Sequence, residues 1–448
     1  MTGQDNGSQG LNPRVADEVE YIRRRFAAKK PAVDVGLVPD GRGGVGYLYV
    51  KGELLVLERD LAAVTESLRR RGITVEEQHI LRGLLLLRIS DKEKKTVPEV
   101  PDVLEALDSD LGEGAATPNH ILTVSEEVSP CAATDPIPVY DGIEPYPSVC
   151  QSNSGAGVRI FIADTGLLPA AKTHSWLATG VDGGEDPESP ELNGGRLQPY
   201  TGHGTFVAGV LRCMAPAAEI YVGAVFPTAG SAPESDFALS MQQALTGGWD
   251  IFHLSIASPT RKNLPLLSFG EWMKLLRQRK GTACVAPAGN SGSSRPHWPG
   301  ASPCVACVGA LAADWRSRAS FSNFGGWVDV YAPGRDLINA YATGDFTCEM
   351  VPYAPEVRKF FGMARWNGTS FSSPILTGLI AARMWCSGEN GSEAAAALLA
   401  QARSQTIPGV GAIVLPCCDE RGTQCRCGPQ CRCAPQCRCG PQRTACTA

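Results

Sequence analysis

From Gly157 onward the chain alternates short apolar runs with segments that favour helices, and this alternation constrains the fold more than any other feature. Strands are expected at residues 158–163, 220–226, 250–256 and 283–287, and helices at 205–214, 234–246 and 269–280. A strand buried on both faces is typically a continuous apolar run. Strands that alternate with helices usually form a parallel sheet. The pattern therefore predicts an α/β fold, a doubly wound parallel sheet flanked by helices.

Composition changes divide the rest of the chain into four further parts. Residues 1–34 are a polar N-terminal segment with a short helix expected at 15–28. Residues 35–126 alternate strand and helix patterns as a small α+β module, and 127–156 form a Pro-rich linker. The α/β domain spans 157–408. Residues 409–448 hold three Cys-Arg-Cys-(Gly or Ala)-Pro-Gln repeats, and we expect a disordered Cys-rich tail because a proline in every repeat prevents regular structure.

Two glycine-containing features of the module predict turns. Residues 47–50 and 54–57 are apolar and flank Gly52, which predicts a hairpin. Residues 41–46 match the dinucleotide pattern G-x-G-x-x-G. That pattern needs a strand before it and a helix after it, whereas here a strand follows. A turn is therefore predicted in place of a nucleotide site.

Charge and hydrophobicity exclude several function classes. The net charge of −5 lacks the excess of basic residues that is typical of nucleic-acid-binding proteins. Apolar runs fall short of the roughly 20 residues that span a bilayer, and the N-terminus lacks the pattern of a secretory signal. We therefore expect a cytoplasmic protein without a membrane segment. Nine of the 17 cysteines lie in the last 32 residues. Paired thiols can bind zinc or copper(I), so a metal-handling role for the tail is one alternative function.

Four polar side chains are placed where strands end or helices begin. Asp164 ends the first buried strand, His203 opens a helix, Asn290 follows another strand, and Ser370 begins an apolar helix. Sites in parallel sheets form beyond the carboxyl ends of the strands. A serine needs a base to become a nucleophile, and that base needs a carboxylate to orient it. An amide can donate to the oxyanion. The set predicts nucleophilic hydrolysis.

In the order Asp, His, Asn, Ser, and in its flanking residues 319–325 and 331–334, the chain resembles the subtilisin-like (subtilase, peptidase S8) serine proteases. The resemblance implies a serine endopeptidase in which Asp164 orients His203, His203 is the base, Ser370 is the nucleophile and Asn290 is the oxyanion donor. It further implies a substrate-binding wall, formed by Ser255, Ile256, Ala257, Ala288 and Gly289. Protein or peptide substrates are expected, and no cofactor is required. Some relatives use calcium, but no metal ligands can be assigned here.

Several alternatives stay open at this point. Ser372 and Ser373 lie within one turn of Ser370, although the motif makes them structural. His174, His253 and His297 are expected to be loop or packing residues. Residues 345–365 are expected to be an insertion. The module resembles a propeptide that would inhibit the cleft from within the same chain, and an unrelated docking domain is its rival. A catalytically idle binding protein that kept the fold is the alternative to an active protease.

Overall fold

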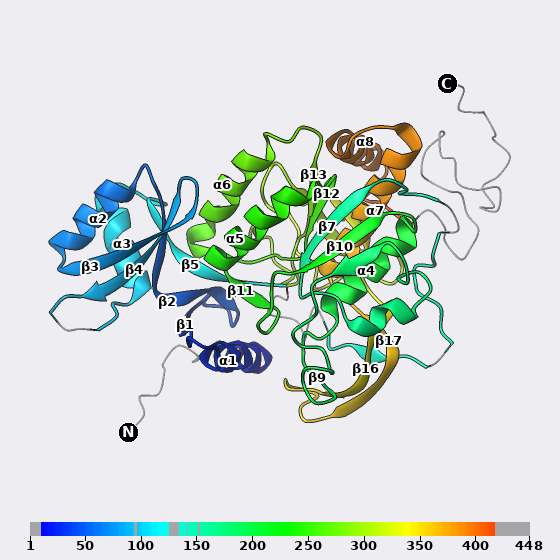
Figure 1. The fold of residues 1–448 in the computed structure, drawn as a ribbon, viewed down its shortest axis with the longest axis horizontal. Helices are drawn as coiled ribbons and strands as arrows, with labels where there is room; N and C mark the ends of the chain where they lie inside the picture. Colours follow the sequence, from blue (N-terminus) through cyan, green and yellow to red (C-terminus); the bar gives the residue numbers. More distant parts are fainter. Residues whose placement is uncertain (1–9, 94–95, 125–133, 141, 151–152, 417–448) are drawn as a thin grey trace.

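The computed structural model describes residues 10–93, 96–124, 134–140, 142–150 and 153–416, and these form two sheet-containing units that lie side by side (Figure 1). We call the unit that contains β1 to β5 the module, and the unit from residue 153 onward the main domain. The prediction that the disordered tail begins at residue 409 is wrong for 409–416: β19 (Gly411–Ala412) pairs with β18 (Thr406–Ile407), and the Val414 amide donates to the Tyr331 carbonyl at 2.9 Å. Residues 417–448 of the tail lie outside the described residues, so the predicted disorder and the metal-handling role stay predictions there.

The main domain is built on a seven-stranded sheet. Its order is β15-β14-β13-β12-β7-β10-β8, and every strand pair in it is parallel. Its strands are β7 (Arg159–Asp164), β8 (Val181–Gly183), β10 (Glu219–Ala224), β12 (Ile251–Leu254), β13 (Ala283–Pro287), β14 (Ala306–Leu311) and β15 (Val330–Pro333). The chain adds strands first on one side of β7 and then on the other, which confirms the predicted doubly wound sheet.

Helices cover both faces of this sheet. Successive residues of a strand point to opposite faces, and β7 shows this directly. Ile160 and Ile162 pack in the cluster that contains α4 (His203–Met214) and α7 (Thr369–Ser387). Phe161 packs in the cluster that contains α5 (Glu234–Ala244) and α6 (Leu267–Leu276). The last helix, α8 (Gly391–Arg403), packs against α7.

Shorter elements complete the main domain. They are the 3₁₀ helices η2 (Pro169–Thr173), η3 (Leu245–Gly247) and η4 (Arg261–Asn263), and the strands β9 (Arg196–Leu197), β18 (Thr406–Ile407) and β19 (Gly411–Ala412). The linker contributes the strand β6 (Ile137–Pro138). The strands β16 (Leu337–Thr347) and β17 (Val357–Trp366) form a long hairpin. The expected insertion, residues 345–365, covers the end of β16, the connection after it and nearly all of β17. In the linker, β6 pairs with β17. The linker therefore adds an edge strand to this hairpin.

The module is an antiparallel sheet with helices on its outer face. Its strands are β1 (Val35–Pro39), β2 (Val45–Leu57), β3 (Ile73–Leu81), β4 (Leu84–Asp91) and β5 (Ala116–Thr123), and its helices are α2 (Leu61–Arg70) and α3 (Val100–Leu111). The hairpin predicted around Gly52 is wrong, because 45–57 is one strand. Gly52 has φ +74° and lies where the pairing of β2 with β5 shifts register. It therefore forms a bulge, which glycine accommodates, and not a turn. The glycine-rich stretch is the loop between β1 and β2.

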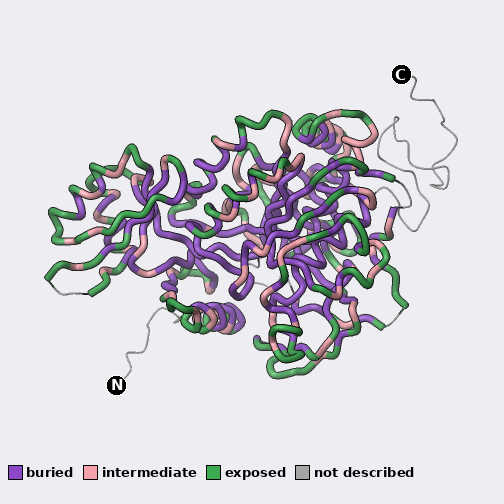
Figure 2. Tube along the Cα trace, in the orientation of Figure 1, coloured by how far each residue is buried: buried purple, intermediate pink, exposed green. Residues whose placement is uncertain are grey.

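The module and the main domain share a sheet and a hydrophobic core. Strand β11 (Ser231–Pro233) of the main domain pairs antiparallel with β5 of the module. The inner face of the module sheet packs on α5 and α6. The polar N-terminal segment forms the predicted helix, α1 (Pro13–Ala27), which lies beside both units; Figure 2 shows that it is buried along one side. The two units are thus held together by backbone pairing as well as by side chains.

Candidate active site

A buried aspartate and histidine meet at the carboxyl end of β7. Asp164 ends this strand, and His203 is the first residue of α4. The distance from His203 Nδ1 to Asp164 Oδ1 is 2.8 Å, and the side chains are 1% and 0% exposed. Because a carboxylate only accepts, Nδ1 carries the proton and Nε2 keeps its lone pair. Nε2 is buried without a hydrogen-bond partner among the described residues. This tautomer is the one that a general base requires.

Two glycines allow the histidine to reach the aspartate. Gly202 has φ +73°, a conformation that glycine adopts without strain, and it turns the chain into α4. At Gly204 a Cβ would overlap the carbonyl oxygen of Gly166 and would lie 3.1 Å from Asp164 Oδ1. The helix can therefore approach the end of β7 only with glycine at this position.

Ser370 is positioned by the first turn of α7, on the same side of the sheet. It is 1% exposed, and its hydroxyl donates to the carbonyl oxygen of Val124 at 3.3 Å. The next residue, Phe371, packs 5.3 Å from the ring of His203, and Trp366 meets the same ring edge-on at 5.7 Å. The imidazole packed against these rings is only 1% exposed. The structure thus brings the three predicted catalytic residues into one buried region.

Asn290 follows β13 and is oriented by the residue before Ser370. Its Oδ1 accepts from the Thr369 amide at 2.8 Å and from the Thr369 hydroxyl at 3.0 Å. The Thr369 hydroxyl in turn accepts from the Gly289 amide at 3.1 Å. Because Oδ1 faces Thr369, the amino group Nδ2 is the part of the side chain that can donate to a carbonyl oxygen. This orientation suits the predicted oxyanion donor.

The segment that ends the module lies between two walls of the main domain. On one side it pairs with β11, and the Val124 amide donates to the Gly230 carbonyl at 2.9 Å. On the other side the Thr123 amide donates to Ser258 Oγ at 3.1 Å. Of the predicted wall, Ser255, Ile256 and Ala257 directly precede Ser258, and all three are buried. Asn323 positions Ala288 and Gly289: its side chain donates to the Ala288 carbonyl, and its backbone amide donates to the Gly289 carbonyl.

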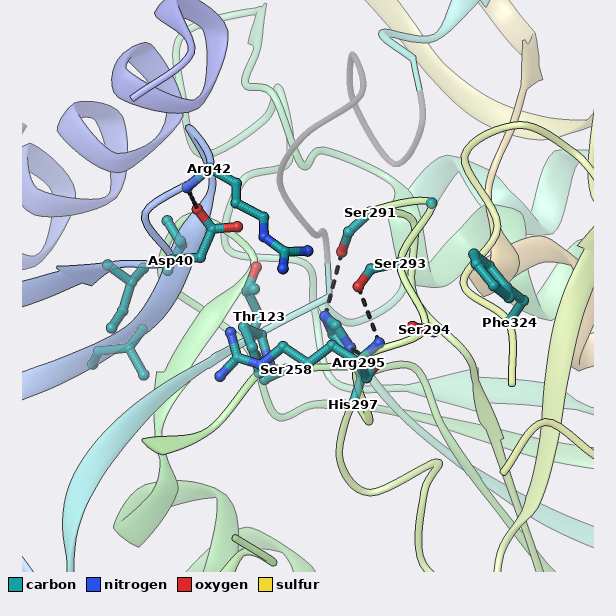
Figure 3. Close-up of a pocket in the computed structure, with 15 residues that line it drawn as sticks. Asp40, Arg42, Thr123, Ser258, Ser291, Ser293, Ser294, Arg295, His297 and Phe324 are labelled. Atoms are coloured by element: carbon teal, nitrogen blue, oxygen red, sulfur yellow. Dashed lines mark hydrogen bonds between the residues drawn. The ribbon is translucent and has the colours of Figure 1, made fainter. Parts of the chain in front are cut away.

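A cavity of about 340 Å³ lies beside this segment, on the side that Ile121 and Thr123 face. Figure 3 shows Arg42 reaching toward it from the loop between β1 and β2, opposite Ser291 and His297 of the main domain. His297 donates from Nδ1 to the Arg295 carbonyl at 2.8 Å, so Nε2 is the acceptor for Ser291 Oγ at 3.3 Å. Part of the cavity wall therefore belongs to the module.

The alternative serines have structural contacts. Ser372 Oγ donates to the Gly368 carbonyl at 3.4 Å within the helix. Ser373 Oγ lies 3.5 Å from Nε2 of His253, and His253 Nδ1 lies 2.8 Å from Thr377 Oγ1. Burial lowers the pKa of His253 to about 3, so this imidazole is neutral. His253 therefore joins β12 to α7 as a packing residue, as the sequence predicts.

Sequence reasoning missed the wall that β11 forms and the hydrogen bond to Ser258. The available signal was weak: residues 230–233 are a short Gly-Ser-Ala-Pro stretch directly before a helix. Within the described ranges, no group of three or more His, Cys, Asp or Glu side chains is arranged to hold a metal ion. Among the helices of that same part of the chain, none has the length and apolar character needed to cross a membrane.

Comparison with known proteins places this geometry in a family. Residues 155–405 match the model of the subtilase family, Peptidase S8. M-protease from Shouchella clausii (strain KSM-K16) and Subtilisin Savinase from Lederbergia lenta are each 29% identical over 239 residues. The match covers 51% of this chain, 54% of M-protease and 76% of Savinase. The fold is similar to that of fervidolysin from Fervidobacterium pennivorans, with TM-score 0.52, 16% identity, and coverage of 82% of this chain and 60% of that one. With the family model spanning more than half of its length, and with Asp164 and His203 paired at the end of β7, this chain belongs to the subtilase family of subtilisin-like serine proteases.

Proposed function

We propose that the chain is a serine endopeptidase that cleaves peptide bonds through the triad Asp164, His203 and Ser370. The observation that carries the proposal is the position of Ser370 Oγ, 3.3 Å from a peptide carbonyl oxygen. The next residue, Phe371, packs 5.3 Å from the buried His203 ring, whose Nδ1 is 2.8 Å from Asp164 Oδ1. A carboxylate, an imidazole and a hydroxyl beside a peptide bond are the groups that acyl transfer requires.

Each residue has a separate role in the proposed reaction. His203 Nε2 takes the hydroxyl proton as Ser370 Oγ attacks the carbonyl carbon, and Asp164 stabilises the imidazolium that forms. Asn290 Nδ2 and the Ser370 amide, at the positive end of α7, donate to the oxyanion. His203 then returns the proton to the leaving amine, which breaks the peptide bond and leaves an acyl-enzyme. A water deprotonated by His203 hydrolyses this ester.

We further propose that the module is an intramolecular inhibitor that the enzyme cuts from itself. The segment Ile121–Val124 is extended between β11 and Ser258, as a bound peptide would be, and its last described carbonyl faces Ser370. Cleavage is expected after Val124 or after Ser125, which gives a new N-terminus at Ser125 or Glu126. The docking-domain alternative would not require a module strand to lie beside the nucleophile.

The module is anchored at the start of α5 by two buried side chains of β5. Asn119 Oδ1 accepts from the Ser235 amide at 3.0 Å. His120 Nδ1 donates to Glu234 Oε2 at 2.7 Å, and both side chains are nearly inaccessible. His120 Nε2 accepts from the Arg261 amide at 3.3 Å. Such specific polar contacts support a module built to fit this surface.

Intact mass of the purified chain beside a Ser370→Ala copy tests both proposals. We expect the chain to appear as two fragments that join within one residue of Val124, and the variant to remain whole. A fluorophosphonate probe then tests the alternative of a catalytically idle binding protein, because an active enzyme is labelled at Ser370 and an idle one is not. A whole, unlabelled wild-type chain that is folded by circular dichroism would refute the protease proposal. The cytoplasmic location stays a prediction of the sequence.

A further inference from the structure

The helix α1 lies outside the module sheet and contacts both units. Its buried apolar residues Val19, Ile22 and Phe26 pack in the same cluster as Val35 of the module and Tyr200 of the main domain. Its N-terminus is capped by Asn12, whose side chain accepts from the Arg14 amide at 3.1 Å. The α5 and α6 surface and β11 already hold the module sheet, so α1 is an additional contact with the main domain.

One set of α1 contacts is made with residues 188–200, which precede the catalytic histidine in the chain. The Tyr200 hydroxyl donates to Glu18 at 2.6 Å, a bond buried on both sides. Tyr21 donates to Gln198 at 3.3 Å. Arg25 pairs with Glu188 at 3.5 Å, and the carboxylate is only 2% exposed. The residues that receive α1 here belong to the segment just before His203.

A second set of contacts reaches the linker and the long hairpin. Arg14 pairs with Asp135 at 3.2 Å, and the two side chains are only 8% and 5% exposed. The same guanidinium donates to the Val351 carbonyl at 2.8 Å, and the Val351 amide donates to Asp17 at 3.0 Å. At the surface, Arg24 pairs with Glu349 at 3.1 Å. Arginines of the helix thus face carboxylates of the main domain and the linker.

These contacts lie on both sides of the proposed cut. Asp135 follows the cut in the chain, whereas α1 precedes it, and none of the contacts described above involves the peptide bond that would be broken. Cutting near Val124 therefore leaves the Arg14–Asp135 and Arg25–Glu188 pairs in place.

We propose that Glu188, Tyr200, Glu349 and Asp135 form a docking surface for α1, and that this surface retains the module on the enzyme after the linker is cut. The proposal rests on the proposed self-cleavage. The partner of the surface is the basic amphipathic helix of the same chain. Release of activity then requires loss of α1 from the surface as well as cleavage near Val124.

The experiment compares variants of the full chain after self-cleavage, with module release followed over time by size-exclusion chromatography. Removing one partner of a buried charge pair mainly raises the dissociation rate, so Arg14→Gln should release the module about thirtyfold faster or more. Asp135→Asn, on the other side of the pair, should act in the same direction and add little to Arg14→Gln. The matched control is Arg69→Gln on α2 of the module, whose guanidinium pairs with Glu66 on the same helix at 2.8 Å. It should leave the release rate unchanged.

Equal release rates for the wild type, Arg14→Gln and Asp135→Asn would overturn the proposal. Release from Arg69→Gln as fast as from Arg14→Gln would also overturn it. If Arg14→Gln does not fold, Asp135→Asn gives the same test from the linker side of the pair. A Ser370→Ala chain with a site for an added protease within residues 127–133 makes the cut without the enzyme's own activity. If the wild-type chain does not cleave itself, the proposed function is rejected. If the module is then released slowly after the added cut, and faster with Arg14→Gln, the docking surface is still supported.

Discussion

The start of α5 is capped by the side chain of Asn119, which belongs to the module. The effect of replacing Asn119 on module docking can therefore be calculated from the hydrogen bonds that it makes. The N-cap residue of α5 is Pro233, which makes no side-chain cap. Asn119 of the module supplies it: Oδ1 accepts from the Ser235 amide at 3.0 Å, and Nδ2 donates to Ser235 Oγ at 3.0 Å. Both residues are buried, with Asn119 0% and Ser235 4% exposed.

The expected effect of Asn119→Ala follows from these two bonds. A net hydrogen bond contributes about 1 kcal/mol, so losing both should weaken docking by about 2 kcal/mol. That corresponds to roughly thirtyfold weaker binding of the module. Asn119 Nδ2 also donates to Glu53 at 2.7 Å, but Glu53 belongs to the module, so this bond affects module stability and not docking.

The assay is inhibition of short-peptide hydrolysis by the module recovered from the self-cleaved protein. Ser235→Ala is the matched control, because it removes only the hydroxyl bond and leaves the amide bond to Asn119; it should weaken inhibition about fivefold, equivalent to about 1 kcal/mol. Faster hydrogen exchange at the Ser235 amide in the Asn119→Ala complex would report the lost cap independently of activity. An inhibition constant for Asn119→Ala within threefold of wild type, with the module folded, would refute the reasoning.

Other predictions concern catalysis, pH and packing. Asn290→Ala should lower kcat by about 10²–10³, as for the corresponding donor of a subtilisin, with KM nearly unchanged; a KM effect alone would contradict its role. Burial raises the pKa of Glu188 from 4.5 to about 7. Its contribution to stability is therefore full below about pH 4.3, and up to about 3 kcal/mol is lost as pH rises through 7. Thermal melting of the Ser370→Ala chain should show this loss. The further variant Glu188→Gln should show a smaller loss, because burial also raises the pKa of Asp186 to about 7 and Asp186 contributes its own loss; identical pH profiles would contradict the assignment. Gly209→Ala on α4 should destabilise the fold by about 1–3 kcal/mol, because its Cβ would overlap Asn339 Oδ1. Gly270→Ala on α6 meets nothing within 4 Å and should be neutral or stabilising in the same melts.

Much of the main domain could be predicted from the sequence because its signals are local. A short apolar run that follows a helix identifies a buried strand from neighbouring residues alone, and the sequence predicts β13 with the bounds that the structure has, Ala283–Pro287. The candidate triad was predicted for the same reason. Asp164, His203 and Ser370 each stand in a short motif at the end of a strand or the start of a helix, and parallel topology brings such positions to one edge.

Tertiary structure alone decided how the module meets this edge. The residues around Gly52 are compatible with either a turn or a bulge. The structure has a bulge because β5 pairs with β2 on both sides of Gly52, while β1 pairs with the first half of β2 and β4 with the second. Strand β11 of the main domain pairs with β5 of the module across more than 100 residues of sequence, and Val124 meets Ser370 across a still longer separation. Arg14 meets Asp135 in the same way. Backbone pairing and ion pairs between distant segments depend on shape and burial that arise only after both units have folded, so no local pattern in the sequence encodes them.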